Sequence, residues 1–128
     1  MADMSDYLEV TLLNETLNGV AFTAVNNPYI SLHTANPTDA GTGTEVSGGS
    51  YARTASSFAT ASGTSGSVAS DADATFPTAT AGWGTVGWIG LHDGSGNLLY
   101  HSALDATKTI DSGDVFKITT GNLTVTLA

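Results

Sequence analysis

The segment VGWIGLHDGSGNLLYHSAL, residues 86–104, has the clearest structural pattern in this sequence. Two runs of mainly aliphatic and aromatic residues, Val86–His92 and Leu98–Leu104, flank the polar stretch Asp93–Asn97, which contains two glycines. Glycines at this spacing supply the positive φ angles that a tight chain reversal requires. The segment therefore predicts a β-hairpin, and it makes strands the expected building unit of the surrounding chain.

Short strand patterns separated by turn clusters continue through the rest of the chain after Pro28. Further strands are expected at Tyr29–His33, Tyr51–Phe58, Thr75–Phe76, Thr107–Ile110, Asp114–Thr119 and the closing alternation of Leu123, Val125 and Leu127. Two long connections, residues 36–50 and 59–70, are rich in Gly, Ser and Thr. Roughly seven or eight strands with such connections predict an all-β fold, a jelly-roll-like β-sandwich over residues 28–128, with an up-and-down barrel as the alternative.

A short α-helix is expected at residues 5–19, before the strands begin. Ser5 or Asp6 is placed to cap its start and Gly19 to end it. An apolar stripe at helical spacing consists of Val10, Leu13, Leu17 and Val20. A stripe this narrow commonly docks on the domain's own body, and this is the preferred interpretation. The alternative is that Leu13 and Leu17 contact a neighbouring subunit.

Length and composition limit the possible architectures. At 128 residues the chain fits a single domain, residues 1–128, because two domains would each be too small for a core. Charged residues make up only 12%, and 20 Thr, 13 Ser and 15 Gly supply most of the polarity. Thr is β-branched and suits a pleated, half-buried surface, so the composition favours sheet over helix.

The charge balance excludes several partners. The net charge is −9, and the only basic residues are Arg53, Lys108 and Lys117. Three basic residues cannot follow a phosphate backbone or an anionic membrane, so neither nucleic acid nor membrane is an expected partner. Cysteine is absent. The first residues lack the pattern of a signal peptide, and we expect synthesis in the cytoplasm of the producing cell.

No residue pattern predicts catalysis or a cofactor. His33, His92 and His101 lack short metal-ligand spacing, so they are interpreted as ordinary strand residues. Asp93–Asn97 begins like a calcium loop, but Leu98 occupies the position that requires glycine, which indicates a turn. No nucleophile elbow occurs, and the three glutamates are scattered. We therefore expect a non-enzymatic protein with no catalytic, cofactor or metal site.

The two tryptophans are the most informative aromatic residues. Trp88 lies between Val86 and Ile89 and is expected in the core. Trp83 is flanked by glycines at the entrance of a strand. It is equally well interpreted as a core residue or as an anchor at a subunit interface.

Three stretches of the chain resemble a known family. These are ISLHTANPTDAGTGTEVSGGSYAR (residues 30–53), ATFPTATAGWGTVGWIGLHD (residues 74–93), and the run from Gly96–Tyr100 through Ile110–Asp114 to the closing strand. They are similar to small tailed-bacteriophage virion proteins that are often labelled tail fibre proteins. Some related proteins look like capsid decoration or cement proteins. The resemblance implies a virion component, and it transfers no catalytic residues.

Two functional hypotheses follow. The first is a capsid decoration or cement protein, expected as a homotrimer at local three-fold positions, that bridges and stabilises major capsid subunits. The alternative is a tail-fibre or baseplate component that contacts other tail proteins or a host surface glycan. Both place the protein on the virion, at the capsid exterior or the tail. A third class, a lectin-like sugar binder, would require an exposed aromatic platform with convergent polar groups.

Overall fold

The computed structural model describes residues 2–23 and 28–127. Met1, residues 24–27 and Ala128, the expected last residue of the sandwich, lie outside the described residues. The elements are β1 Asp3–Met4, α1 Asp6–Asn18, β2 Tyr29–His33, β3 Thr54–Ala55, β4 Ser67–Ala69, β5 Ala74–Thr75, β6 Gly84–His92, β7 Leu98–Ile110, β8 Lys117–Ile118 and β9 Thr124–Thr126. The predicted all-β fold with one short N-terminal helix is confirmed.

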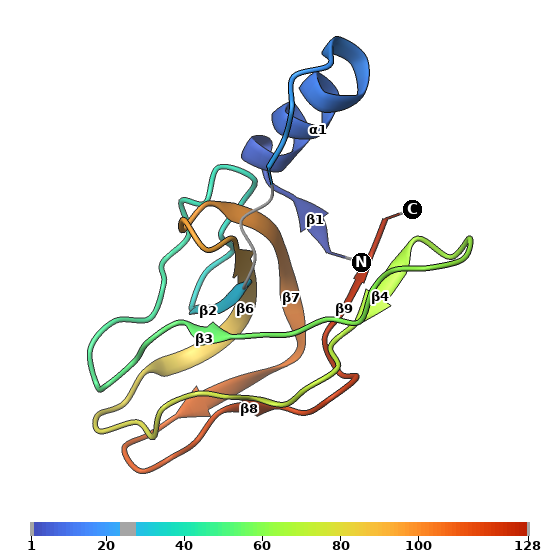
Figure 1. Cartoon of the computed structure of the whole chain (residues 1–128). Coiled ribbons are helices and arrows are strands. Elements are labelled where there is room, and N and C mark those ends of the chain that lie inside the picture. Colours follow the sequence, from blue (N-terminus) through green and yellow to red (C-terminus); the bar gives the residue numbers. More distant parts are fainter. Residues whose placement is uncertain (1, 24–27, 128) are drawn as a thin grey trace.

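The strands form two layers (Figure 1). One layer is a five-stranded antiparallel sheet in the order β1-β7-β6-β2-β3. Two short antiparallel ladders, β4 with β9 and β5 with β8, lie against it as the second layer. Side chains from both layers share one hydrophobic core, which includes Leu32, Val86 and Ile110 from the sheet and Phe76 and Val125 from the second layer. This is the arrangement of a β-sandwich.

The central hairpin is longer than the sequence pattern predicts. Strand β7 continues without interruption where two separate strands were expected, Leu98–Leu104 and Thr107–Ile110. Val86 of β6 pairs with Lys108, and Trp88 pairs with Ala103, so Gly87 alone stands opposite residues 104–107 of β7. This bulge bends β7 and leaves both of its halves paired with β6. The apparent break in the pattern is therefore a bulge within one strand.

Several other boundaries also differ from the prediction. The expected strand Tyr51–Phe58 is reduced to β3, because only Thr54 and Ala55 reach β2 at the sheet edge. The Tyr51 side chain instead turns inward, and its hydroxyl accepts a hydrogen bond from the Leu32 amide. β1 and β4 were not predicted, since each is only two or three residues long and depends on a distant partner strand.

Helix α1 has the predicted start and end. The Ser5 hydroxyl accepts a hydrogen bond from the Leu8 amide at 3.2 Å, and Gly19 ends the helix with φ 65°. Ser5 also donates to the Leu98 carbonyl, which fixes the base of the helix to the start of β7. From this base α1 projects away from the sandwich (Figure 1). In the described part of the chain, no helix has the length and apolar character that crossing a membrane requires.

Candidate interaction surface

The apolar stripe of α1 does not pack on the body of the protein. Leu13 is 56% exposed and Leu17 is 75% exposed, and Val10 and Val20 are exposed as well. The side that meets the body carries Leu8, which is buried, and Leu12, which is half-buried. Because residues four apart share a helix face, Leu8 and Leu12 lie on one side and Leu13 and Leu17 on another. The preferred interpretation, docking on the protein's own body, is wrong for this stripe.

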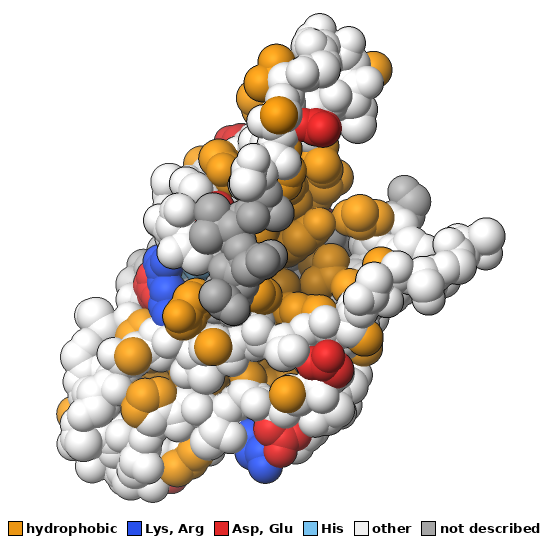
Figure 2. Space-filling view, in the orientation of Figure 1, with side chains coloured by type: hydrophobic (Ala, Val, Ile, Leu, Met, Phe, Trp, Pro, Cys, Tyr) orange, Lys and Arg blue, Asp and Glu red, His pale blue; other side chains and the backbone are white. Residues whose placement is uncertain are grey.

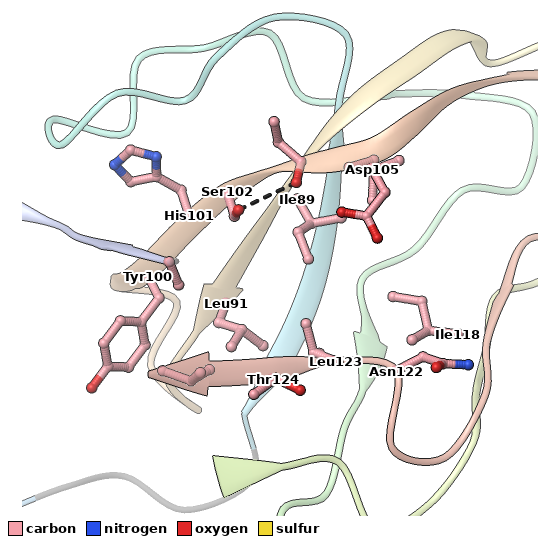
Figure 3. Close-up of a pocket in the computed structure, with 14 residues that line it drawn as sticks. Ile89, Leu91, Tyr100, His101, Ser102, Asp105, Ile118, Asn122, Leu123 and Thr124 are labelled. Atoms are coloured by element: carbon pink, nitrogen blue, oxygen red, sulfur yellow. Dashed lines mark hydrogen bonds between the residues drawn. The ribbon is translucent and has the colours of Figure 1, made fainter. Parts of the chain in front are cut away.

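A groove lined by both apolar and polar side chains opens between the two layers of the sandwich. Its accessible volume is about 320 Å³. Leu91 from β6 and Leu123 from the second layer meet across it, while Tyr100 and Ile118 lie toward its two ends (Figure 3). His101 extends from the opposite side of β7 to Tyr100 (Figure 3). The groove therefore exposes the margin of the hydrophobic core.

This groove continues toward the helix. Ala2, which lines it, also lines a second hollow bounded by Met4, Leu12 and Leu127. Figure 2 shows hydrophobic side chains gathered in the hollow between α1 and the arm that β4 and β9 form. The stripe of Leu13 and Leu17 lies on another side of α1 and forms a separate exposed apolar patch. Soluble monomers rarely expose such surfaces unless they bind another molecule.

Trp83 is a core residue and does not lie on this surface. Its side chain is only 5% exposed, and its indole N–H donates to the Gly49 carbonyl at 3.0 Å. Its ring meets that of Tyr51 edge to face, with 5.4 Å between centroids. The interpretation of Trp83 as an exposed interface anchor therefore does not fit its position. Trp88, expected in the core, is only half-buried.

A second, polar pocket lies under the start of α1, and His33 and His92 line it. The buried Ser31 lies between these two histidines. The Ser31 hydroxyl lies 2.7 Å from Nε2 of His33 and 2.8 Å from Nε2 of His92. One hydroxyl proton can serve only one of these nitrogens. Nδ1 of His92 faces the Gly96 carbonyl at 3.2 Å and must donate to it, so Nε2 of His92 accepts from Ser31. Nε2 of His33 then faces the hydroxyl oxygen of Ser31.

The other ring nitrogen of His33 is enclosed by the protein. Nδ1 of His33 is buried and makes no hydrogen bond within the described residues. Burial lowers the pKa of both His33 and His92, so these rings are neutral at pH 7. Sequence reasoning placed the three histidines on strands, which is confirmed, but it missed this cluster. The signal was the spacing of Ser31 and His33, which puts both on one face of β2.

An ion pair stiffens the wall of this pocket. Arg53 donates to both carboxylate oxygens of Glu45, through Nε at 2.9 Å and Nη2 at 2.8 Å. The Tyr51 hydroxyl donates to the same carboxylate at 2.8 Å. Burial alone would raise the pKa of Glu45, but these hydrogen bonds outweigh it and lower the pKa. Glu45 is therefore an anion, and hydrogen bonds from Arg53 and Tyr51 hold its carboxylate in place.

The remaining aspartates mostly shape turns. Asp93 accepts hydrogen bonds from the amides of Ser95 and Asn97, both at 2.9 Å, so the predicted turn is confirmed. Asp73 instead pairs with Lys117 at 2.9 Å and accepts from Thr120. Within the described residues, no group of three or more His, Asp or Glu side chains is arranged to hold a metal ion.

Comparison with known proteins gives one family. The model of a family described as podophage GP4 fiber I protein gp80 matches residues 3–126. No curated protein matches the chain. The match includes α1, the central hairpin and both layers of the sandwich, and its description fits the tail-fibre alternative better than capsid decoration. The chain therefore belongs to the podophage GP4 fiber I protein gp80 family, and it is a structural protein of a bacteriophage virion.

Proposed function

We propose that this protein is a tail-fibre component that docks on another tail protein through the exposed apolar face of α1. The observation that carries the proposal is the exposure of Leu13 and Leu17 on a helix that projects from a well-packed body. The fibre description of the matching family supports a position on the tail. The proposed role is mechanical, and it requires no catalytic group.

The physical basis is apolar burial. Fully burying a Leu or Val side chain contributes about 1.5–3 kcal/mol, so a partner groove that covers the stripe would hold the subunit firmly. Val10, which is 58% exposed on the same helix, adds to the apolar area that a partner could cover. The net charge of −9 keeps free subunits apart in solution until such a partner is present.

Point variants on α1 test this proposal better than removal of residues 1–20. Deletion would also remove β1, which pairs with β7, and the buried Leu8. The double variant Leu13→Ser/Leu17→Ser changes only exposed side chains. We expect it to fold normally but to fall at least about tenfold in copies per purified virion, measured by quantitative mass spectrometry, since a loss of about 1.4 kcal/mol corresponds to a factor of ten in binding.

Val115→Ser is the matched control, because Val115 is an apolar side chain with 51% exposure outside the helix. Its incorporation should equal that of the unmodified protein. Normal incorporation of the Leu13→Ser/Leu17→Ser protein would overturn docking through α1. The oligomeric state of both variants, by light scattering, separates a hetero-subunit contact from a contact within the expected homotrimer.

Position on the virion is tested independently. Immunogold labelling of intact particles should mark the tail, and the copy number should follow the closed symmetry of a tail assembly. Labelling over the head shell at hundreds of copies would instead support capsid decoration, with the major capsid protein as partner. That result would overturn the tail position without affecting the role of α1.

A further inference from the structure

The exposed apolar residues of α1 have the spacing of a helix–helix contact. Val10, Leu13 and Leu17 are separated by three and then four residues, and Val20, just after the helix-ending Gly19, follows by three. This alternation is that of the two apolar positions in a heptad, at which paired helices meet. A helix that packs on a globular body usually presents a wider apolar face. The spacing therefore fits a second helix that lies along α1.

This row of side chains is open to solvent along its length. Val10 is 58% exposed, and the two leucines are exposed by more than half as well. The helix contacts its own body through the side that carries Leu8, which is only 4% exposed. Because α1 projects from the sandwich, its outer side is accessible to an element of another protein (Figure 1).

Two carboxylates mark one end of the row. Since a helix advances about 100° per residue, Asp6 lies in line with Val10 one turn earlier, and Glu9 lies beside this line. Both side chains are exposed, and neither makes an ion pair within the described residues. The sequence of α1 contains no Lys or Arg. A partner that covers the row must therefore meet negative charge at the end nearest the body.

This charge distinguishes between possible partners. A neutral partner would remove the two carboxylates from water without supplying a counter-charge, which is unfavourable. A second copy in parallel orientation would place the same carboxylates beside each other, and each copy also carries a net charge of −9. A helix with basic residues beside its apolar positions avoids both penalties, because ionised donors form strong hydrogen bonds with carboxylates.

We propose that the partner of α1 is an α-helix of another tail protein, paired along Val10, Leu13 and Leu17, with Lys or Arg side chains that meet Asp6 and Glu9. The partner helix carries apolar residues at the same alternating spacing of three and four. The inference rests on the proposed docking through α1, and it adds the secondary structure and the charge of the partner.

The first test maps the partner in purified virions that contain the full chain. The photoreactive apolar amino acid p-benzoylphenylalanine replaces Val10 in one variant and Leu17 in another. These positions lie seven residues apart, or about 10.5 Å along the helix axis. A partner helix covers that length with about seven residues and a strand with about three. Mass spectrometry should place the two cross-links in one segment of another virion protein, about seven residues apart.

The same amino acid at Val115 is the matched control. Val115 is an apolar side chain with 51% exposure, and it lies outside the helix. Cross-links from this position should not reach the partner segment that residues 10 and 17 mark.

The second test reverses the charge beside the row. Glu9→Lys should lower the number of copies per purified virion at least about threefold, because an exposed attraction becomes a repulsion. Asp105→Lys is the matched control, since it changes the net charge equally at an exposed residue of β7. Its incorporation should equal that of the unmodified protein. Circular dichroism confirms that both variants are folded.

Several results would overturn the proposal. These are cross-links about three residues apart, as in a strand, cross-links scattered over several segments, cross-links to a second copy of this chain, and no cross-link from either position. Normal incorporation of Glu9→Lys would overturn the basic character of the partner.

Failure of this inference is distinguishable from failure of the proposed function. If Leu13→Ser/Leu17→Ser is lost from virions but the cross-links have the spacing of a strand, docking through α1 stands and the partner helix is refuted. Normal incorporation of that double variant would refute the docking itself. Cross-links with helical spacing to a head-shell protein would refute the tail position and leave the helix pairing intact.

Discussion

Helix α1 and the β6–β7 hairpin are both rich in apolar residues, yet they use them in opposite ways. Val86 and Leu91 in the hairpin are 0% and 5% exposed, whereas Leu13 and Leu17 in the helix are 56% and 75% exposed. The hairpin lies between β1 and β2 in the sheet and packs against the second layer, while the helix is attached to the body mainly at its base. Hydrophobicity in the sequence therefore serves folding in one region and, on our proposal, assembly in the other.

The largest expected effect tests the packed region. Phe76 is 2% exposed. The centroid of its ring lies 5.5 Å from that of Phe116 and 6.3 Å from that of Tyr51. Phe76→Ala should lower the free energy of unfolding by about 3–5 kcal/mol, because the cavity it leaves cannot refill. Urea denaturation followed by tryptophan fluorescence measures this loss. A loss below about 1 kcal/mol would mean that the body is not the tightly packed region.

A smaller loss of stability is expected when the pH is lowered, and it also arises in the sandwich. His33 and His92 have lowered pKa values because they are buried, so the unfolded chain binds protons more readily than the folded protein. The free energy of unfolding should be at its full value above the ordinary histidine pKa of 6.5. It should fall as the pH drops below that value. Urea midpoints at about pH 7.5 and about pH 5 measure the change.

Carboxylates do not account for a change in this window. Glu45, between His33 and Arg53, has a lowered pKa, and hydrogen bonds from Lys117 and Thr120 hold the pKa of Asp73 at about 2. These groups stay ionised until the solution is more acidic than the histidine window. An unchanged urea midpoint between the two pH values would show that the histidines are not buried in their neutral form.

The smallest change in the free energy of unfolding is expected for a substitution in the helix. Leu17→Ser should change the free energy of unfolding by no more than about 0.5 kcal/mol, because the side chain is already in water in the folded protein. Thermal unfolding followed by circular dichroism measures it, with Phe76→Ala as the reference for a buried site. A loss above about 1 kcal/mol would place Leu17 in a contact within its own chain and would remove the contrast between the two regions.

Features that depend on near neighbours could be predicted from the sequence. The turn at Asp93–Asn97 and the helix caps Ser5 and Gly19 follow from local backbone and hydrogen-bond preferences. The buried positions Ile30 and Leu32 follow from the period of a strand. The burial of Ser31 and His33, on the other face of β2, could not be predicted this way, because it depends on His92 and the loop of residues 36–50.

The sequence by itself determined the class of the protein: an acidic, threonine-rich β-sandwich with few charged residues, a capped helix and a hairpin at its centre. These properties arise from composition and from residues a few positions apart. Only the tertiary structure decided that the stripe of α1 faces solvent, that β7 bulges opposite Gly87, and that His33, Asp39 and Arg53 line one pocket. Each of these depends on which distant segments meet, and local periodicity carries no information about that choice.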